Sequence, residues 1–318
     1  MIEENSIAIL GAGLCGLTLA NTLSENSIYI IEKSKAVGGR MATRRDGLAT
    51  YDHGAQFYTQ SKAQDFFWHQ RWIEKGISKQ WFVRGDRSHF CGTAGMTILA
   101  KDLAADRKIF FEEKVLAIDA QTSTLKIKCE SGKIFEAKRV ILTSPLPQSL
   151  EILRASGILY PLELEKVKYA KAIVGLVQLS DADSTDVDFL DFASPGSALF
   201  SVANNKSKGI SHEHALSLVM NPEWSEQHFN ESDEVLVEKI VGEFSRYYPH
   251  KFQIQKAQIK KWRYSHPIEC YTQDFLPLLN DKLILAGDGF TAGSLNGAQR
   301  SALAVTEFLK FPEIVDKK

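Results

Sequence analysis

The sequence is poor in the features that define several classes of protein. Its 318 residues include four cysteines, which are scattered, with neither a Cys-x-x-Cys pair nor the spacing of a zinc site. We therefore expect neither a disulfide-stabilised fold nor a bound metal. No repeat, low-complexity tract or proline-rich linker divides the chain, so a second domain would have to be built from insertions into the first. With 44% hydrophobic and 24% charged residues, the chain has the proportions of a globular protein.

An excess of one charge and long apolar runs are also missing. Lysine and arginine total 38 against 39 aspartate and glutamate, and the basic residues form no long block of the kind that follows a phosphate backbone. Nucleic acid is therefore not an expected partner. The opening "MIEEN" is acidic where a signal peptide would be basic, and no stretch approaches the roughly 18 apolar residues of a membrane span. We expect a cytoplasmic protein without a membrane partner.

The first chemical signal that is present is the stretch "SIAILGAGLCGLTLANTL". An apolar strand over residues 7–10 runs into Gly11-x-Gly13-x-x-Gly16, and an apolar helical pattern follows over residues 14–23. In such a loop the first glycine permits a tight turn, the second lets a pyrophosphate approach the backbone, and the third allows close packing of helix on strand. The helix N-terminus then faces the anion. A glycine turn without a ligand is the alternative.

A second strand pattern, "SIYIIEKS", adds an acid to this loop. It ends in Glu32, about 20 residues after the glycines, where a carboxylate can accept hydrogen bonds from an adenosine ribose. An acid at this position disfavours a 2′-phosphate. The loop and the acid together indicate a Rossmann-like domain that binds FAD or NAD rather than NADP.

The stretch "KAVGGRM" distinguishes FAD from NAD. In a simple nicotinamide dehydrogenase the chain after the ribose acid usually continues into a second βα unit, but here Gly38-Gly39 follows within a few residues. This pair would bring the backbone close to the pyrophosphate, whose charge Arg40 can neutralise with its planar fork of donors. The alternative is an ordinary turn with a solvated arginine.

Two further stretches favour a flavin. Gly54-Ala55 marks a place where the isoalloxazine ring could pass over the chain, although a crossing of small residues between strands would look the same. In "DKLILAGDGF" an apolar strand over residues 283–286 precedes Asp288, which could meet ribityl hydroxyls. A helix that starts at residues 296–298 would stabilise the negative charge of a reduced flavin. A hairpin turn before a packing helix is the alternative for this segment.

The order of these motifs resembles the renalase family over nearly the whole chain. The resemblance rests on the glycine loop, Glu32 and, in order, "GGRMAT", "DHGAQFYT", "GMTILAKDLA", "TSPLPQ", "KKWRYSHP" and "GDGF". Members of that family vary at the positions of His53 and of residues 296–298, which bears on the substrate more than on the fold.

Similarity to this family implies an α/β protein, with a Rossmann-like FAD-binding domain interleaved with a smaller substrate domain of mixed β-sheet plus helices. It implies an oxidase of the amine-oxidase-like group that acts on dihydronicotinamide dinucleotides reduced at the 2- or 6-position. Hydride would pass to flavin N5, and oxygen would take the electrons to give NAD(P) and hydrogen peroxide. An FAD-dependent amine oxidase and a non-catalytic flavin-binding protein stay open as alternatives. Against an amine oxidase, no lysine is evident that would anchor the water that such enzymes often hold near N5.

We expect FAD to be bound non-covalently, because no cysteine lies in an attachment motif. Cys15 stands at a helix N-terminus, which would lower its thiol pKa, but packing and backbone binding are its favoured roles. The expected cofactor-binding residues are Gly11, Gly13, Leu14, Cys15, Gly16, Glu32, Lys33, Gly39, Arg40, Met41, Gly54, Ala55, Gln56, Phe57, Val115, Gly287, Asp288, Asn296, Gly297 and Ala298.

The candidate substrate pocket consists of Gln56, Tyr58, Trp262 and Arg263. The tryptophan offers an aromatic face for a nicotinamide or adenine, and the arginine offers a cation for a phosphate. The alternative is a strand that buries Trp262 and Tyr264 and leaves Arg263 in solvent.

Other polar residues have two interpretations each. Asn204 and Asn205 in "SVANNKSKG" either bind the ligand or form a polar surface turn. His53 and His266 are either proton donors or structural histidines.

The remaining patterns fit an interleaved chain. We expect the FAD-binding domain over residues 1–60, 93–145 and 277–318, and the substrate domain over residues 61–92 and 146–276. Within them the sequence predicts a helix over residues 61–76 capped by Ser61 and ended by Gly76, a hairpin over 79–92, strands over 108–144 and a helix over 234–247.

Overall fold

The chain folds into two compact units, each made of segments that are far apart in the sequence. The first unit contains residues 1–39, 100–168 and 266–318, and the second contains residues 40–99 and 169–265. None of the described helices is long and apolar enough to cross a membrane. The computed structural model describes residues 6–24, 27–61, 65–180, 188–192, 196–248, 252–290 and 292–310.

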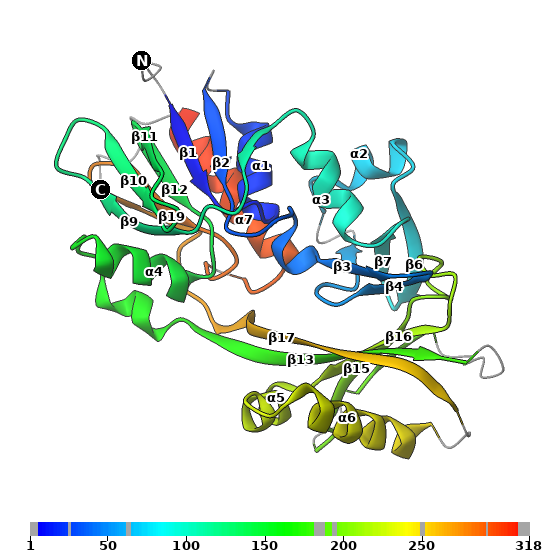
Figure 1. Ribbon diagram of the computed structural model, residues 1–318. Coiled ribbons are helices and arrows are strands. Elements are labelled where there is room, and N and C mark those ends of the chain that lie inside the picture. The colour runs from blue at the N-terminus through cyan, green and yellow to red at the C-terminus, as the bar shows by residue number, and fades with distance from the viewer. Residues whose placement is uncertain are drawn as a thin grey trace. The chain divides into compact units, whose positions relative to one another are not determined.

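The first unit is built on a six-stranded sheet of short, apolar strands (Figure 1). The strands from β19 to β8 run parallel, and β18 is antiparallel at one edge. Such near-continuous apolar runs are typical of strands that are buried on both faces. Across the sheet the strands are β18 (Phe275–Leu278), β19 (Leu283–Ala286), β12 (Arg139–Leu142), β1 (Ile7–Leu10), β2 (Ile28–Ile31) and β8 (Lys108–Phe110).

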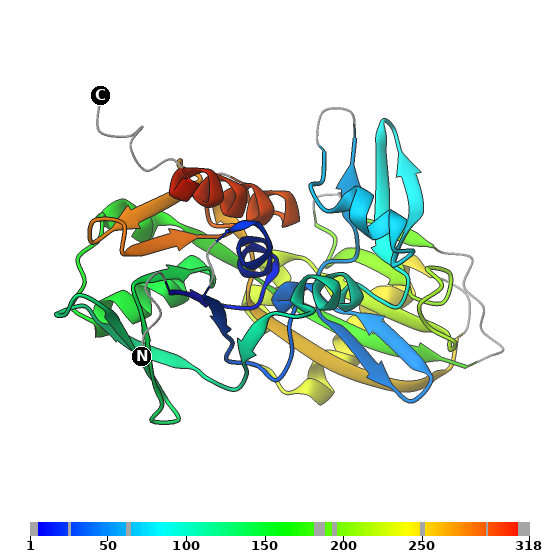
Figure 2. The same ribbon diagram turned by 90° about the horizontal axis from the view of Figure 1, so that it is seen from above.

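Two helices pack side by side on this sheet. α1 (Leu14–Thr22) follows β1, and α7 (Leu295–Lys310) lies against it, as Figure 2 shows in dark blue and red. The hydroxyls of Thr22 and Thr306 join the two helices at 2.7 Å. Because β1 and β19 are neighbours of β12 in the sheet, the turns that follow them lie at the same edge. The mixed α/β architecture with a Rossmann-like parallel sheet confirms the expected fold class.

A smaller antiparallel sheet completes the first unit. Its strands are β9 (Val115–Asp119), β10 (Leu125–Cys129) and β11 (Ile134–Ala137). The helix α4 (Leu146–Ala155) packs on β9, and a short 3₁₀ helix, η2, covers Leu162–Lys166.

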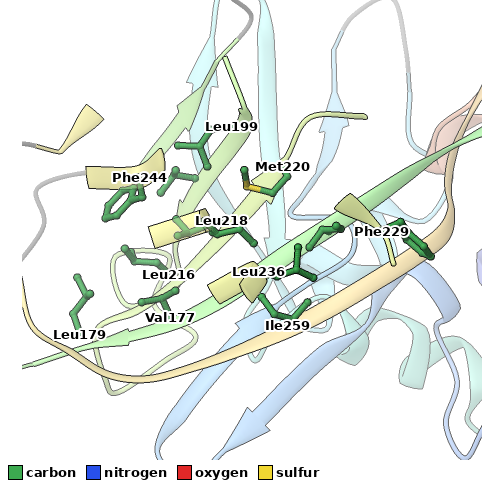
Figure 3. Packing of buried hydrophobic residues seen from close by; sticks show 13 residues of the cluster. Val177, Leu179, Leu199, Leu216, Leu218, Met220, Phe229, Leu236, Phe244 and Ile259 are labelled. Atoms are coloured by element: carbon green, nitrogen blue, oxygen red, sulfur yellow. The ribbon is translucent and has the colours of Figure 1, made fainter. Parts of the chain in front are cut away.

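The second unit is built on a five-stranded sheet that α5 (Pro222–His228) and α6 (Asp233–Tyr247) cover on one face (Figure 1). Leu218 from the sheet, Leu236 from α6 and Ile259 meet in the core between them (Figure 3). The side chains of Asn221 and Ser232 cap the two helices by accepting a first-turn N–H. The strands, in order across the sheet, are β14 (Phe189–Asp191), β15 (Leu199–Asn204), β16 (Ala215–Met220), β13 (Lys168–Leu179) and β17 (Ile254–Glu269).

Shorter elements complete the second unit. The hairpin β3–β4 packs on β16, and strands β5, β7 and β6 form a separate sheet beside α2. Two elements, η1 and α3, span a boundary between the units. Their bounds are η1 (Gly39–Met41), β3 (Thr43–Asp46), β4 (Ala49–Asp52), β5 (Tyr58–Gln60), α2 (His69–Glu74), β6 (Ser78–Arg84), β7 (Arg87–Gly92) and α3 (Thr97–Ala104).

The predicted elements were confirmed in most places, with one clear error. The strands at residues 7–10, 140–142 and 283–286, the hairpin over 79–92 and the helix over 234–247 are all present. The helix expected from Ser61 begins only at His69, because Trp68 rather than Ser61 is its N-cap. Residues 62–64 of that expectation lie outside the described residues. Gly76, with a φ of 63°, follows the helix as predicted.

The two units divide the chain at other positions than the expected domains. Residues 40–60 and 93–99 belong to the second unit, and residues 146–168 and 266–276 belong to the first. The sequence marks turns, whereas compactness depends on which strands pack together. The long strands β13 and β17 each continue from one unit into the other.

Candidate functional site

The glycine loop of the first unit has the geometry that a dinucleotide requires. Gly11 has a φ of 112°, and a Cβ at Gly16 would lie 2.1 Å from the carbonyl oxygen of Gly11, so both positions need glycine. A Cβ at Gly13 would meet no described atom within 4 Å. Gly11 and Gly16 therefore shape the loop, while Gly13 leaves open space beside it.

The N-terminus of α1 adjoins this space. Gly13 is the N-cap, no side chain in the described part of the chain caps the helix there, and its first turn carries no acidic residue. The backbone N–H groups at the start of a helix carry a partial positive charge and form a natural site for an anion. Leu14, Cys15 and Gly16, three of the expected cofactor residues, occupy this first turn.

Glu32 lies at the end of β2 and is fixed beside the loop. Its Oε2 accepts a hydrogen bond from the Ala12 N–H at 2.7 Å, and its Oε1 accepts one from the Ser34 N–H at 2.8 Å. The residue is buried, with 7% of its surface exposed. Lys33, the next residue, is exposed and donates to Gln148 at 2.9 Å.

The second glycine pair returns to the first. The Gly38 N–H donates to the Ala12 carbonyl at 2.8 Å, and a Cβ at Gly39 would lie 3.7 Å from the Gly13 Cα. Both glycines have positive φ angles. The structure thus brings together two glycine motifs that the sequence separates.

The segment after β19 also lies in the first unit. Asp288 is buried, and Gly287 donates its N–H to Ser301 on α7 at 2.8 Å. The helix begins at Leu295, so residues 296–298 form its first turn. A Cβ at Gly297 would lie 1.7 Å from the Ala292 carbonyl oxygen, so this glycine is required by close packing. Val115, a further expected cofactor residue, is half-buried at the start of β9.

Cys15 differs from expectation. Burial and the charge of Asp288 raise the pKa of its thiol, the opposite of the lowering expected from a helix N-terminus. The expected lowering was wrong because it considered the helix dipole without the cost of burying a thiolate. Cys15 stays protonated, in keeping with a packing role.

In the second unit the turn over residues 53–55 lies on the backbone that follows Gly39. The Ala55 N–H donates to the Arg40 carbonyl at 2.8 Å, and the His53 N–H donates to the Ala42 carbonyl at 3.1 Å. A Cβ at Gly54 would lie 1.9 Å from the Arg40 carbonyl oxygen. Gly54 is therefore required by this contact between backbones.

The Arg40 side chain is held within the same unit. Its Nη1 donates to the Ser265 carbonyl at 3.2 Å, and its guanidinium lies 5.7 Å from the centre of the Tyr169 ring. Met41, the next residue, is buried.

The candidate pocket residues near residue 56 point into the protein. Gln56 is buried, donates to the carbonyls of Asp52 and Gly54, and leaves its Oε1 without a partner in the described structure. Tyr58 packs among buried aromatic rings, and its hydroxyl contacts Ser78 at 2.8 Å. Burial raises the pKa of Tyr58 to about 12. Phe57 contacts the rings of Phe82, His89 and Phe189 edge-on.

The other two candidate pocket residues are not brought together. Trp262 packs with the core formed by β4, β13 and β16, and its indole N–H donates to the His53 carbonyl at 2.7 Å. Arg263, the next residue along β17, is exposed on the opposite face, 5.7 Å from the ring of Phe229. Trp262 and Arg263 thus point to opposite faces of a β-strand, which is the alternative interpretation given in the sequence analysis.

His53 stacks on Trp262 with ring centres 5.4 Å apart. Burial, with the positive charge of Lys260, lowers the pKa of His53 to about 4. The imidazole is therefore neutral at pH 7, which argues against a role as a cationic proton donor. His266 is exposed.

Sequence reasoning missed a buried ion pair between Asp52 and Lys208. The two side chains are 0% exposed, and the ammonium lies 2.6 Å from Asp52 Oδ2. The segment "NNKSKG" is not a surface turn, because Asn204, Asn205 and Lys208 are all buried. Asn205 bonds within the unit, to Ser217 and the Ala215 carbonyl. A polar run between two apolar strands was the only signal, and it fits a surface turn equally well.

Comparison with known proteins decides the family. The profile of flavin containing amine oxidoreductases matches residues 60–307, more than half of the chain. The chain belongs to this family. The profile of the NAD(P)-binding Rossmann-like domain matches residues 9–69, which include the glycine loop.

Individual proteins are also similar to the chain over nearly its whole length. Renalase of Mus musculus is 24% identical over 342 residues, which cover 96% of this chain and 98% of the mouse protein. A putative protoporphyrinogen oxidase from Exiguobacterium sp. 255-15 is 12% identical with a TM-score of 0.74, and covers 98% of this chain and 100% of its own. A fatty acid isomerase from P. acnes is 11% identical with a TM-score of 0.71, covering 97% and 99%. The two solved structures share the fold.

As a member of the flavin amine oxidoreductase family, the protein is a flavin-dependent oxidoreductase that uses FAD and acts on a small molecule. The first unit fits the dinucleotide part of FAD. The open space at Gly13, the uncapped start of α1 and the buried Glu32 carboxylate are the features that such a ligand uses.

Proposed function

We propose that this protein oxidises dihydronicotinamide dinucleotides that are reduced at the 2- or 6-position of the ring. A proton and oxygen are consumed with the dinucleotide, and NAD(P) and hydrogen peroxide are formed. The observation that carries the proposal is the likeness to mouse Renalase along nearly the whole of both chains, together with the order of the motifs. When bound, FAD supplies a hydride acceptor at N5 and passes the electrons to oxygen.

The chain's own residues have three tasks in this proposal. The first-turn N–H groups of α1 and the Glu32 carboxylate hold the dinucleotide part of FAD, without a covalent bond. Arg40 neutralises the pyrophosphate, and the cradle of Ser265 and Tyr169 orients its guanidinium. The isoalloxazine ring lies over the backbone of Gly54-Ala55.

For the substrate we keep two of the four candidates, Trp262 and Gln56, the latter because its buried Oε1 has no partner in the described structure. The indole of Trp262 is partly exposed and is fixed by its bond to the His53 carbonyl, so it can offer a rigid aromatic face to a planar ring. Tyr58 is enclosed by other rings, and Arg263 lies on the opposite face of β17. In the proposal, Tyr58 and Arg263 therefore stabilise the second unit and do not contact the substrate.

The test is anaerobic stopped-flow reduction of the flavin. We expect the 2- and 6-dihydro isomers to bleach the flavin about a hundredfold faster than ordinary NADH, because a reactive carbon that lies near 1 Å out of place can cost that factor. Reoxidation in air should then release hydrogen peroxide. Bleaching by NADH at an equal rate would overturn the proposal. Acid precipitation should leave the flavin in the supernatant, and colour in the pellet would contradict a non-covalent bond.

Amine oxidation is the second candidate, and the family to which the chain belongs favours it. The fully buried Lys208 makes its contacts with Asp52, Gln56 and Trp81, so it is not available as a lysine that holds a water. Primary amines and polyamines belong in the same stopped-flow panel. Bleaching by amines alone would establish this function in place of the first.

A further inference from the structure

The buried ion pair of the second unit joins the two ends of one turn. The Lys208 ammonium lies 2.6 Å from Asp52 Oδ2 and 2.5 Å from the Gln56 carbonyl oxygen, and 4.7 Å from the centre of the Trp81 ring. Asp52 precedes the turn over residues 53–55, and Gln56 follows it. One ammonium group therefore spans the turn.

The carboxylate is also fully engaged. Asp52 Oδ1 accepts from the Thr43 hydroxyl at 2.6 Å and from the Met96 N–H at 2.8 Å. The Asp52 backbone carbonyl accepts from the Ser217 hydroxyl at 2.7 Å. The start of the turn is thus connected to β3, to the backbone just before α3 and to β16 through charge-assisted and ordinary hydrogen bonds.

The pair is not explained by stability alone. Apolar residues of similar volume often stabilise a core as well as a buried ion pair does. An apolar side chain at residue 208 would, however, leave the buried Gln56 carbonyl without the donor that Lys208 supplies. A lysine has three N–H donors, and here they meet a carboxylate, a carbonyl and an aromatic face at once.

We propose that Lys208 is a positioning residue for the flavin. Through Asp52 and Gln56 it sets the shape of the 53–55 turn, and this shape sets the position of the isoalloxazine ring that lies over the turn. The inference rests on the flavin contact of Gly54-Ala55 in the proposed function. Lys208 touches neither substrate nor reacting atoms. Its effect is transmitted because the same turn is bound to the Arg40 carbonyl through Ala55.

The experiment compares the parent holoprotein with the double variant Asp52→Asn/Lys208→Met. The double variant removes both charges, so neither is left buried without a partner, and the introduced asparagine amide keeps an acceptor oxygen for Thr43 and Met96. We expect the double variant to be folded, with a cooperative unfolding transition. Its affinity for FAD should be at least about tenfold weaker than that of the parent, and the visible spectrum of its bound flavin should be shifted. The dissociation constant is measured from flavin fluorescence on dilution.

The matched control is Lys171→Met/Glu226→Gln. Lys171 pairs with Glu226 at 2.7 Å and lies 4.9 Å from the ring of Phe229, so it has a carboxylate and an aromatic partner in the same unit but does not contact the turn. We expect its FAD affinity to stay within about twofold and its spectrum to match that of the parent.

Two results would overturn the inference. One is a folded Asp52→Asn/Lys208→Met protein with the parent's FAD affinity and spectrum, and the other is an equal change in the control. The proposed substrate fails separately, if the parent holds FAD that the dihydronicotinamide isomers do not bleach. The comparison of the Asp52→Asn/Lys208→Met variant with its control is still valid in that case, because FAD affinity and the flavin spectrum require only bound flavin.

Discussion

The two units hold their candidate ligand-binding backbone in different ways. In the first unit the contacts around the glycine loop join Ala12 with Glu32 and Gly38, all within one short stretch of chain, and they use mainly backbone groups. In the second unit the turn over residues 53–55 has backbone hydrogen bonds to Arg40 and Ala42, but its two ends are braced by the side chain of Lys208, which lies 156 residues from Asp52 in sequence.

This difference shows two solutions to one requirement. Backbone groups at a strand end and a helix start need only glycine to come close, and the helix supplies the charge. A turn between two strands has no such built-in charge, so its shape depends on side chains that arrive from other segments. We therefore expect the glycine loop to be sensitive to the size of side chains, and the side chains that brace the 53–55 turn to be sensitive to loss of their charge.

The largest effect is expected for Lys208→Met. Removal of one partner leaves Asp52 as a buried, unpaired charge, and the free energy of unfolding should fall by about 3 to 5 kcal/mol. Lys171→Met breaks an ion pair with Glu226, whose side chain is 64% exposed, and should lower the free energy of unfolding by less than about 1 kcal/mol. Urea denaturation of both variants measures the contrast. Equal losses would contradict the distinct role of the buried Asp52–Lys208 pair.

Size is tested by two alanine substitutions in the glycine loop. Gly16→Ala places a Cβ against the Gly11 carbonyl and should lower the free energy of unfolding by about 1 to 3 kcal/mol. Gly13→Ala places it in open space, so stability should change by less than about 0.5 kcal/mol. FAD affinity should nevertheless fall by about tenfold, because the methyl group takes the space where the pyrophosphate approaches. Thermal melts with and without FAD separate the two effects, and an unchanged affinity of Gly13→Ala would place the pyrophosphate elsewhere.

His53 provides a pH test of the second unit. Its pKa is about 4 when folded, below the roughly 6.5 of the unfolded chain. The unfolded chain therefore binds the proton first, and stability falls as the pH is lowered from about 6.5 towards 4. Between pH 7 and pH 5 the parent should lose about 2 kcal/mol more than His53→Phe, which cannot titrate. Urea midpoints across that range give the comparison, and parallel curves would show that His53 is not the group responsible.

A modest effect is expected for Trp262→Phe. The substitution keeps an aromatic ring against His53 but removes the N–H that bonds the His53 carbonyl, and about 1 kcal/mol of stability should be lost. If the residue also offers a face to the substrate, KM should rise while the affinity for FAD stays close to that of the parent. An unchanged KM would remove Trp262 from the substrate pocket.

Much of the first unit could be predicted from the sequence. The strand at Ile7–Leu10, the start of α1 at Leu14 and the place of Glu32 follow from local rules: apolar runs form buried strands, and glycine at fixed spacing permits a turn. The return of Gly38 to Ala12 is also local, since the two residues are joined by one helix, one strand and a short loop.

The hairpin over residues 79–92 and the helix over 234–247 were predicted in the second unit, but its tertiary contacts could not be predicted in this way. The periodicity of β17 shows that Trp262 and Arg263 face opposite sides, but it does not show which side His53 occupies. The sequence "SVANNKSKG" indicates a polar turn, and nothing in it says that Lys208 is buried against Asp52. The sequence by itself determined where the glycine loop forms and which cofactor it suits, because those features depend on neighbouring residues. Only the tertiary structure decided how the 53–55 turn is held, because the partners of a buried charge come from whichever distant strands pack around it.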